Sequence, residues 1–305
     1  MVIDGQRREE RRGILFALAA FVFWGVATPL HFKLLGGVPA DQILSHRVVW
    51  ALLLVLAMVA AARRWTELGA VLARPRDLGL LACSAILVGG NWLLYIWAVN
   101  DGRLVESSLG YFINPLVNVA LGMLFLGERL GRRQVAACCL AAAAVLALAV
   151  SLGAAPWVAL ALAFSFGFYG LIRKTVRVDP LIGLAVESAI LAPFAAVYLV
   201  FLGVRGEAVV GDARTLALLL ATGVTTALPL LWFAAAAQRL KLSTLGLLQY
   251  MSPTLQLALG VFVFGETFTT AHAVAFAAIW AALALYSFDA LRPAWRARAV
   301  PQRSS

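Results

Sequence analysis

Long stretches of this chain contain no Asp, Glu, Lys or Arg. They span residues 78–100, 107–127, 215–238, 242–265 and 267–288. A helix needs about 20 apolar residues to cross a bilayer, and few segments of soluble proteins meet that requirement. With 63% hydrophobic residues, 13% charged residues and a mean hydropathy of +0.90, the chain has too little polar surface to cover a water-soluble globule. The sequence therefore predicts an all-α membrane protein in a lipid bilayer.

The number of spans follows from the breaks between them. The uncharged stretch 134–172 is too long for one span and contains Pro156, a residue tolerated at a helix start but not inside a helix. It therefore predicts two spans. Three more are expected at 13–35, 39–62 and 180–202, which makes ten transmembrane helices.

The basic residues predict the orientation. Twenty of the 25 Lys and Arg fall in segments that are cytoplasmic if the N-terminus lies inside, as the positive-inside rule requires. Both termini are therefore expected on the cytoplasmic side of the membrane. The net charge of +10 reflects this topology. Because the bases are scattered over separate loops, no nucleic-acid partner is expected.

One motif occurs twice. The residues Leu121, Gly122, Gly127 and Glu128, after Pro115, recur with the same spacing as Leu259, Gly260, Gly265 and Glu266, after Pro253. Five spans per copy is an odd number, so the two halves should lie inverted in the membrane. The predicted organisation is a cytoplasmic tail (1–12), a first five-helix repeat (13–151), a second, inverted five-helix repeat (155–291) and a second cytoplasmic tail (292–305).

Polar residues are kept in register within the repeat. Tyr111, Asn114 and Asn118 of the fourth span match Gln249, Ser252 and Gln256 of the ninth, and the third span carries Asn91 and Tyr95 four residues apart. Such helix faces point inward. We therefore expect these eight residues to bind substrate in a shared polar cavity. Interhelical hydrogen bonding is the alternative for each residue taken singly.

Ionisable residues within the spans form a second candidate group: His46, Arg47 and Glu187. A charge at membrane depth costs about 2.5–3.5 kcal/mol, so a partner is expected. An Arg47–Glu187 ion pair or a His46–Glu187 hydrogen bond would supply one. The group is either structural or a site for a coupled proton or substrate. Lys33 is a candidate outer gate, with membrane anchoring as the alternative.

Motifs for other chemistry are missing from the sequence. Cys83, Cys138 and Cys139 lie in predicted spans without a CxxC or Cys/His spacing, so we expect buried small residues and no metal site. There is no Walker A motif, hence no ATP-binding domain, and no cofactor is expected. The three histidines lie on different spans without HExxH, so no catalytic residue is predicted and an intramembrane enzyme is the weakest alternative.

Five segments carry a family resemblance: 39–47, 90–100, 108–116, 163–171 and 242–246. They resemble the RarD-type permeases, a branch of the EamA group within the drug/metabolite transporter superfamily, and the resemblance runs from about Gly13 to Asp289. It implies an EamA-like carrier of two inverted five-helix repeats. Related carriers export amino acids and other small metabolites, and RarD is linked by name to chloramphenicol. The family commonly has a tyrosine where this chain has His31, so no role of that hydroxyl carries over.

The expected function is therefore a secondary permease that moves small metabolites or drug-like molecules across the inner membrane by alternating access, with export as the expected direction. Its partners would be a small-molecule substrate, the lipid bilayer and, if Glu187 or His46 titrates, a coupled proton. A passive facilitator or channel is the alternative.

Overall fold

The structure is a computed structural model. It describes residues 2–100, 104–152, 156–209 and 212–263, together with single positions between 270 and 285. All regular structure in this part of the chain is helical. In chain order the helices are α1 (Val2–Val22), the π-helix η1 (Phe23–Ala27), α2 (Thr28–Leu34), α3 (Ala40–Ala61), α4 (Trp65–Leu72), α5 (Pro75–Asn100), α6 (Leu104–Leu126), α7 (Arg132–Leu152), α8 (Pro156–Thr175), α9 (Pro180–Arg205), α10 (Ala213–Arg239), α11 (Leu242–Gln249) and α12 (Met251–Phe262).

Six of the described helices are long and apolar enough to cross a membrane. They are Arg8–Leu34, Ala40–Ala61, Pro75–Ala98, Trp157–Thr175, Pro180–Arg205 and Ala213–Arg239. All six coincide with predicted spans, so the prediction of an all-α membrane protein is confirmed. The predicted tenth span lies mainly outside the described residues, and the count of ten stays a prediction.

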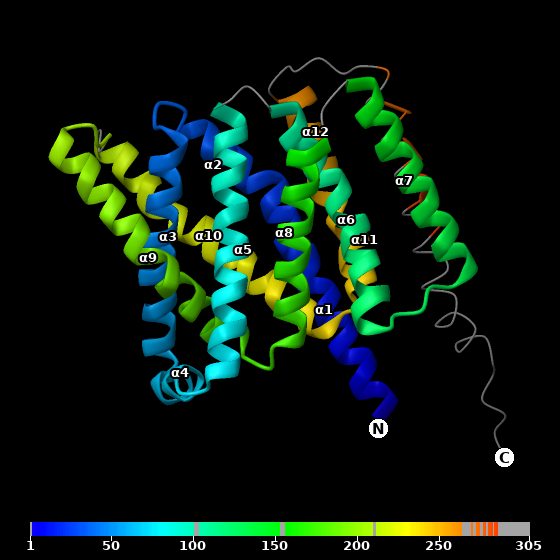
Figure 1. The fold of residues 1–305 in the computed structure, drawn as a ribbon, viewed down its shortest axis with the longest axis horizontal. Coiled ribbons are helices and arrows are strands. Elements are labelled where there is room, and N and C mark those ends of the chain that lie inside the picture. Colours follow the sequence, from blue (N-terminus) through cyan, green and yellow to red (C-terminus); the bar gives the residue numbers. More distant parts are fainter. Residues whose placement is uncertain are drawn as a thin grey trace.

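The helices form one bundle, which has an upper and a lower end in Figure 1. At the upper end lie the α2–α3 turn and the ends of α5, α9 and α12. At the lower end lie α4, the start of α1, the α8–α9 turn and the α10–α11 turn.

Four local features differ from the sequence prediction. The connection 63–77 contains a helix, α4; the stretch 242–265 is broken at Tyr250 into α11 and α12; and the predicted tail 1–12 is helical from Val2. Cys83 and Cys139 are exposed on the bundle surface, so the expectation of buried cysteines is wrong for these two. In a bilayer such positions face lipid, which accepts a small apolar side chain.

The π-helix has an identifiable cause. Pro29 has no N–H to donate and its ring crowds the preceding turn, which loosens the α-helical pattern there. The Thr28 N–H instead bonds to Phe23 O, five residues back. The Trp24 carbonyl then has no main-chain partner, since its two candidate donors are the engaged Thr28 N–H and the proline. π-Turns of this kind are frequent at functional sites.

Glu128 of the repeated motif caps another helix. Its carboxylate accepts hydrogen bonds from the N–H groups of Leu242 (2.6 Å) and Ser243 (3.0 Å) and from Ser243 Oγ (2.6 Å). These are the free donors at the start of α11, where a negative charge is also favoured by the helix dipole. Gly127, at φ 62°, allows the turn that brings Glu128 there. The motif therefore joins α6 of the first half to α11 of the second.

Candidate substrate-binding cavity

A cavity of about 520 Å³ runs from the middle of the bundle to its upper end. It has the size of a small-molecule site. Its wall is mainly aromatic and apolar, with a few polar groups. The residues that decide its chemistry are Trp24, Thr28, Phe32, Arg47, Asn91, Trp92, Tyr95, Tyr111, Asn114, Phe166, Thr226, Gln249, Ser252 and Gln256.

Seven of the eight predicted substrate-binding residues line this cavity. They are Asn91, Tyr95, Tyr111, Asn114, Gln249, Ser252 and Gln256. Asn118 does not line it. Its side chain is fully buried behind the wall, where it donates to Asn114 Oδ1 (3.2 Å) and Gln249 Oε1 (3.0 Å). Asn118 therefore positions two residues of the wall.

Several amides of the wall are engaged by main-chain carbonyls. Asn114 Nδ2 donates to Ala163 O of α8 at 2.7 Å, and Asn91 Nδ2 donates to Leu162 O at 2.8 Å. Gln256 Nε2 donates to Trp24 O at 3.2 Å, which satisfies the carbonyl that the π-helix leaves free. These groups join helices by hydrogen bonds and also line the cavity, and their role in substrate binding stays a prediction.

Arg47 lies in the cavity wall and not in an ion pair. Its Nε donates to Thr226 Oγ1 of α10 at 2.9 Å. The guanidinium carbon lies 4.9 Å from the ring centroid of Trp92 and 5.3 Å from that of Phe32, within the range of cation–π attraction. The predicted ion pair between Arg47 and Glu187 is therefore wrong.

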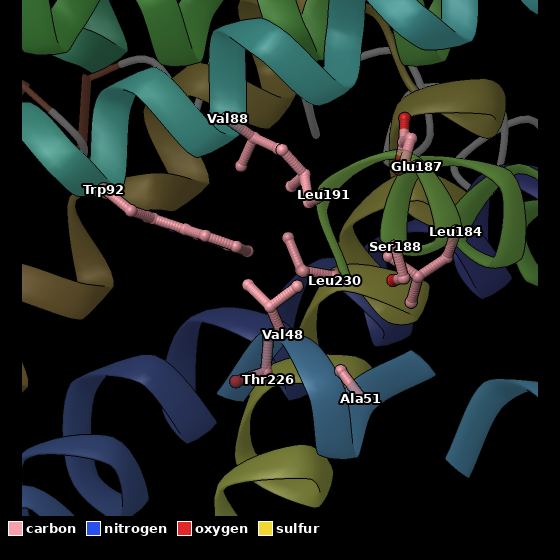
Figure 2. A pocket seen from close by; sticks show the side chains of 10 residues that line it. All are labelled: Val48, Ala51, Val88, Trp92, Leu184, Glu187, Ser188, Leu191, Thr226 and Leu230. Carbon is pink, nitrogen blue, oxygen red and sulfur yellow. The ribbon is translucent and has the colours of Figure 1, made fainter. Parts of the chain in front are cut away.

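Glu187 has other partners. Ser84 Oγ of α5 donates to Glu187 Oε1, and Arg173 Nη1 lies 3.6 Å from the same oxygen. A pocket of about 10 Å³ separates Glu187 from Trp92 (Figure 2), with apolar side chains such as Leu191 and Leu230 around it. A space of this size holds about one water molecule. Glu187 is thus set apart from the main cavity.

Arg173 is the charged residue that the sequence analysis missed. The sequence counts Arg173 among the bases of a cytoplasmic loop, yet its side chain is 0% exposed in the last turn of α8. Gly183 of α9 lies against the guanidinium, and a Cβ there would collide with it. Arg173 Nε and Nη1 and Glu187 Oε2 have no hydrogen-bond partner among the described residues. The signal was weak: a basic residue at a helix end usually marks a loop.

The remaining predicted residues lie off the cavity wall. His46 accepts a hydrogen bond from Trp50 Nε1 at 3.2 Å, and the predicted contact with Glu187 is replaced by this one. Lys33 is exposed in the last turn of α2 at the upper end. His31 is buried and bonds to Thr225 Oγ1 (3.2 Å) and Leu218 O (2.9 Å) of α10, so it ties α2 to α10.

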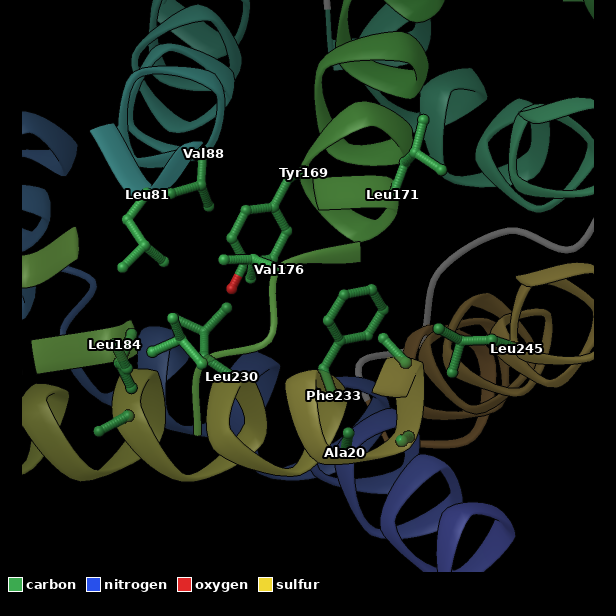
Figure 3. Close-up of a cluster of buried hydrophobic side chains, with 14 of the residues drawn as sticks. Ala20, Leu81, Val88, Tyr169, Leu171, Val176, Leu184, Leu230, Phe233 and Leu245 are labelled. Atoms are coloured by element: carbon green, nitrogen blue, oxygen red, sulfur yellow. The ribbon is translucent and has the colours of Figure 1, made fainter. Parts of the chain in front are cut away.

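The bundle below the cavity is closed by packed side chains. Phe21, Trp24, Phe166, Tyr169 and Phe233 form a chain of ring contacts with centroid separations of 5.2–6.2 Å. Tyr169 and Phe233 stack at the centre of the core (Figure 3). Because these rings come from α1, η1, α8 and α10, the floor of the cavity is made by both predicted halves.

An ion pair joins the two predicted halves at the lower end. Arg64 Nη1 lies 3.0 Å from Asp179 Oδ1 of the other half, while its Nε and Nη2 bond to Glu67 of its own half. The hydrogen bond from Arg64 lowers the pKa of Glu67 below its usual value. The pair therefore persists at neutral pH and weakens as the pH falls through that lowered pKa.

The bundle of apolar helices around a ligand-sized, partly polar cavity is the architecture of a membrane transporter for small molecules. Residues 11–150 match the model of the EamA-like transporter family. The chain is 49% identical over 286 residues to the protein RarD of Salmonella typhi, covering 93% of this chain and 97% of that one. It is 47% identical over 300 residues to an uncharacterized transporter of Vibrio cholerae, covering 98% and 99%. A protein of known crystal structure shares the fold, with a TM-score of 0.73 at 20% identity, covering 90% and 97%.

The chain therefore belongs to the EamA-like transporter family and, within it, to the RarD-type permeases, as the sequence motifs indicated. It is a multi-pass membrane transporter.

Proposed function

We propose that the chain is a secondary carrier that moves small amphipathic molecules through the 520 Å³ cavity by alternating access. The observation that carries this proposal is the asymmetry of the bundle. A cavity reaches the upper end, while aromatic rings and polar contacts between the two halves close the lower end. A permanent channel would need no such closure, so the asymmetry favours a carrier over the facilitator or channel alternative.

The orientation and the repeat are part of the proposal. The distribution of basic residues favours a cytoplasmic lower end with both termini inside, and in this orientation the cavity faces outward. The packing supports two inverted halves: α1 packs on α10 as α8 packs on α5. In matched positions, Asn114 donates to a carbonyl of α8 and Ser252 donates to Phe21 O of α1 at 3.0 Å. Two inverted five-helix repeats at 13–151 and 155–291 remain the organisation that we propose.

Substrate identity and energy coupling follow from this proposal as further predictions. Export is the direction we propose, by analogy with related carriers. A relative from Pseudomonas aeruginosa, 34% identical, is named chloramphenicol-sensitive protein RarD, so chloramphenicol belongs in a substrate screen. A coupled proton stays a prediction, which transport with and without an imposed pH gradient decides.

A cross-link at the lower end tests the carrier mechanism. In the variant Arg64→Cys/Asp179→Cys, a short bifunctional methanethiosulfonate would tie the two halves together where they are now in contact. Loss of the exposed pair costs about 0–1 kcal/mol, and loss of the Asp179 cap on the Leu181 N–H costs about 0.5–2 kcal/mol, so the fold should stay intact. We expect the linked protein to lose transport in proteoliposomes, with recovery after reduction. The substrate would come from a thermal-shift screen of metabolites and chloramphenicol on purified protein.

The matched control lies on the same arginine. Arg64→Cys/Glu67→Cys places both thiols in the first half, three residues apart, so the same reagent cannot tie the halves together. This linked protein should transport normally. Transport that continues through the 64–179 link would refute alternating access at this end and favour a channel.

A further inference from the structure

The cavity wall holds one charge. Of the described residues that line the cavity, Arg47 alone has a charged side chain. No carboxylate of the described residues lies within ion-pair distance of it. Its Nε donates a hydrogen bond to Thr226 Oγ1. A guanidinium without a counter-charge among the described residues therefore faces a space large enough for a ligand.

The protein compensates this cation only in part. The rings of Trp92 and Phe32 contribute cation–π attraction, and Thr226 accepts one hydrogen bond. A charge at membrane depth is stabilised by a counter-charge. The planar fork of an arginine matches a carboxylate, which can accept two parallel hydrogen bonds from it.

The rest of the wall fits the apolar body of such a ligand. Tyr95 and Tyr111 meet edge to face at a centroid separation of 6.1 Å, and Trp92 extends from α5 towards Leu230 (Figure 2). Both tyrosines and Trp92 line the same cavity as Arg47. Aromatic walls with a single cation select an amphipathic molecule with one negative end.

We propose that Arg47 binds the carboxylate of an organic anion whose apolar or aromatic body lies against Trp92, Tyr95 and Tyr111. The inference names the substrate class of the cavity and so rests on the function proposed above. The sequence predicts that Arg47 needs a counter-charge. In this proposal the carboxylate of the substrate supplies it in place of Glu187.

The field of Arg47 can be measured with a reporter thiol. Ile43 lies one helical turn before Arg47 and lines the cavity, so Ile43→Cys places a thiol near the guanidinium. The reporter variant also carries Cys83→Ala, Cys138→Ala and Cys139→Ala, so that it has no native thiol. Two methanethiosulfonates are compared, the anionic sulfonatoethyl reagent and the cationic trimethylammonioethyl reagent. We expect the ratio of the anionic to the cationic reaction rate at position 43 to be about tenfold higher than the same ratio for a free thiol. The preference should vanish in Arg47→Gln.

Arg205 provides the matched control. It lies at the same end of the bundle, 4.5 Å above the Phe201 ring, and does not line the cavity. Arg205→Gln removes the same charge from the protein and should leave the preference for the anionic reagent unchanged.

Ligand protection then tests the carboxylate itself. Indole-3-acetate and indole-3-acetamide share the aromatic body and differ in charge. We expect indole-3-acetate to protect the thiol at position 43 at concentrations about tenfold lower than the amide does. Protection should be lost in Arg47→Gln and partly kept in Arg47→Lys, which retains the charge without the fork.

Equal protection by both compounds, no protection by either, or protection that survives Arg47→Gln would each overturn the inference. Failure of the proposed function has a different signature, because the transport assay on the 64–179 link does not depend on the reporter thiol or on Arg47.

Discussion

Glu187→Leu is expected to destabilise the protein by about 3–5 kcal/mol, because it leaves Arg173 as an uncompensated cation in a fully buried site. A guanidinium does not lose its proton in proteins, so the site has no other way to become neutral. Arg173→Met should cost less, since a lone buried carboxyl can take up a proton. Thermal unfolding of the purified protein in detergent measures both effects.

A double variant identifies the ion-pair partner of Glu187. Arg173→Met/Glu187→Leu replaces the pair by apolar side chains and should be more stable than Glu187→Leu alone, as is usual for isosteric replacement of buried ion pairs. Arg47→Met/Glu187→Leu should instead show additive losses, because Arg47 contacts Thr226 and two rings. Coupling of Glu187 with Arg47 and additivity with Arg173 would show that the pairing described here is wrong.

Gly223→Ala is expected to disturb the crossing of α3 and α10. A Cβ on Gly223 would lie 2.6 Å from the main-chain carbon and 2.7 Å from the main-chain oxygen of Trp50, and backbone atoms cannot turn aside as a side chain can. Overpacking of this kind costs about 1–3 kcal/mol. The same crossing brings Thr226 to Arg47, so the substitution should also weaken binding of any ligand held by Arg47. Unfolding temperature and ligand protection of a cavity thiol measure the two effects.

Gly90→Ala is the matched control, because no atom lies within 4 Å of a Cβ at this exposed position of α5. It should be neutral or stabilise the helix by about 0.5–1 kcal/mol. If Gly223→Ala behaved like Gly90→Ala, the two helices would not be in main-chain contact.

The cavity wall was predictable from the sequence because a bilayer makes polar residues conspicuous. In an apolar helix, side chains such as Tyr111 and Asn114 at helical spacing have to face other helices or a cavity. The chain carries the pattern twice, which pointed to a single shared site. Seven of the predicted residues line one cavity for this reason.

Pairings between distant residues could not be predicted in the same way. Sequence places Glu187 and Arg47 at similar depth, but partner choice depends on which helix faces meet. Arg173 reaches Glu187 because it lies in the last turn of α8, a short connection before α9 begins, and Gly183 of α9 leaves room for the guanidinium. Likewise, the hydrogen bond from Gln256 to Trp24 O depends on the π-helix, which arises from Pro29 and has no periodic signal.

The central claim is that one cavity opens alternately to the two sides of the membrane, and a thiol at its floor tests this claim most directly. Ser252→Cys, without the three native cysteines, can be exposed to an impermeant thiol reagent from either side of oriented vesicles. Ser252 is 7% exposed and lines the cavity. We expect the thiol to react from both sides. When Arg64→Cys/Asp179→Cys is added and this pair is linked before the reagent is applied, only the reaction from the cytoplasmic side should be lost. Reaction from the outer side only, whether or not the link is present, would contradict the account and make the cavity a one-sided vestibule.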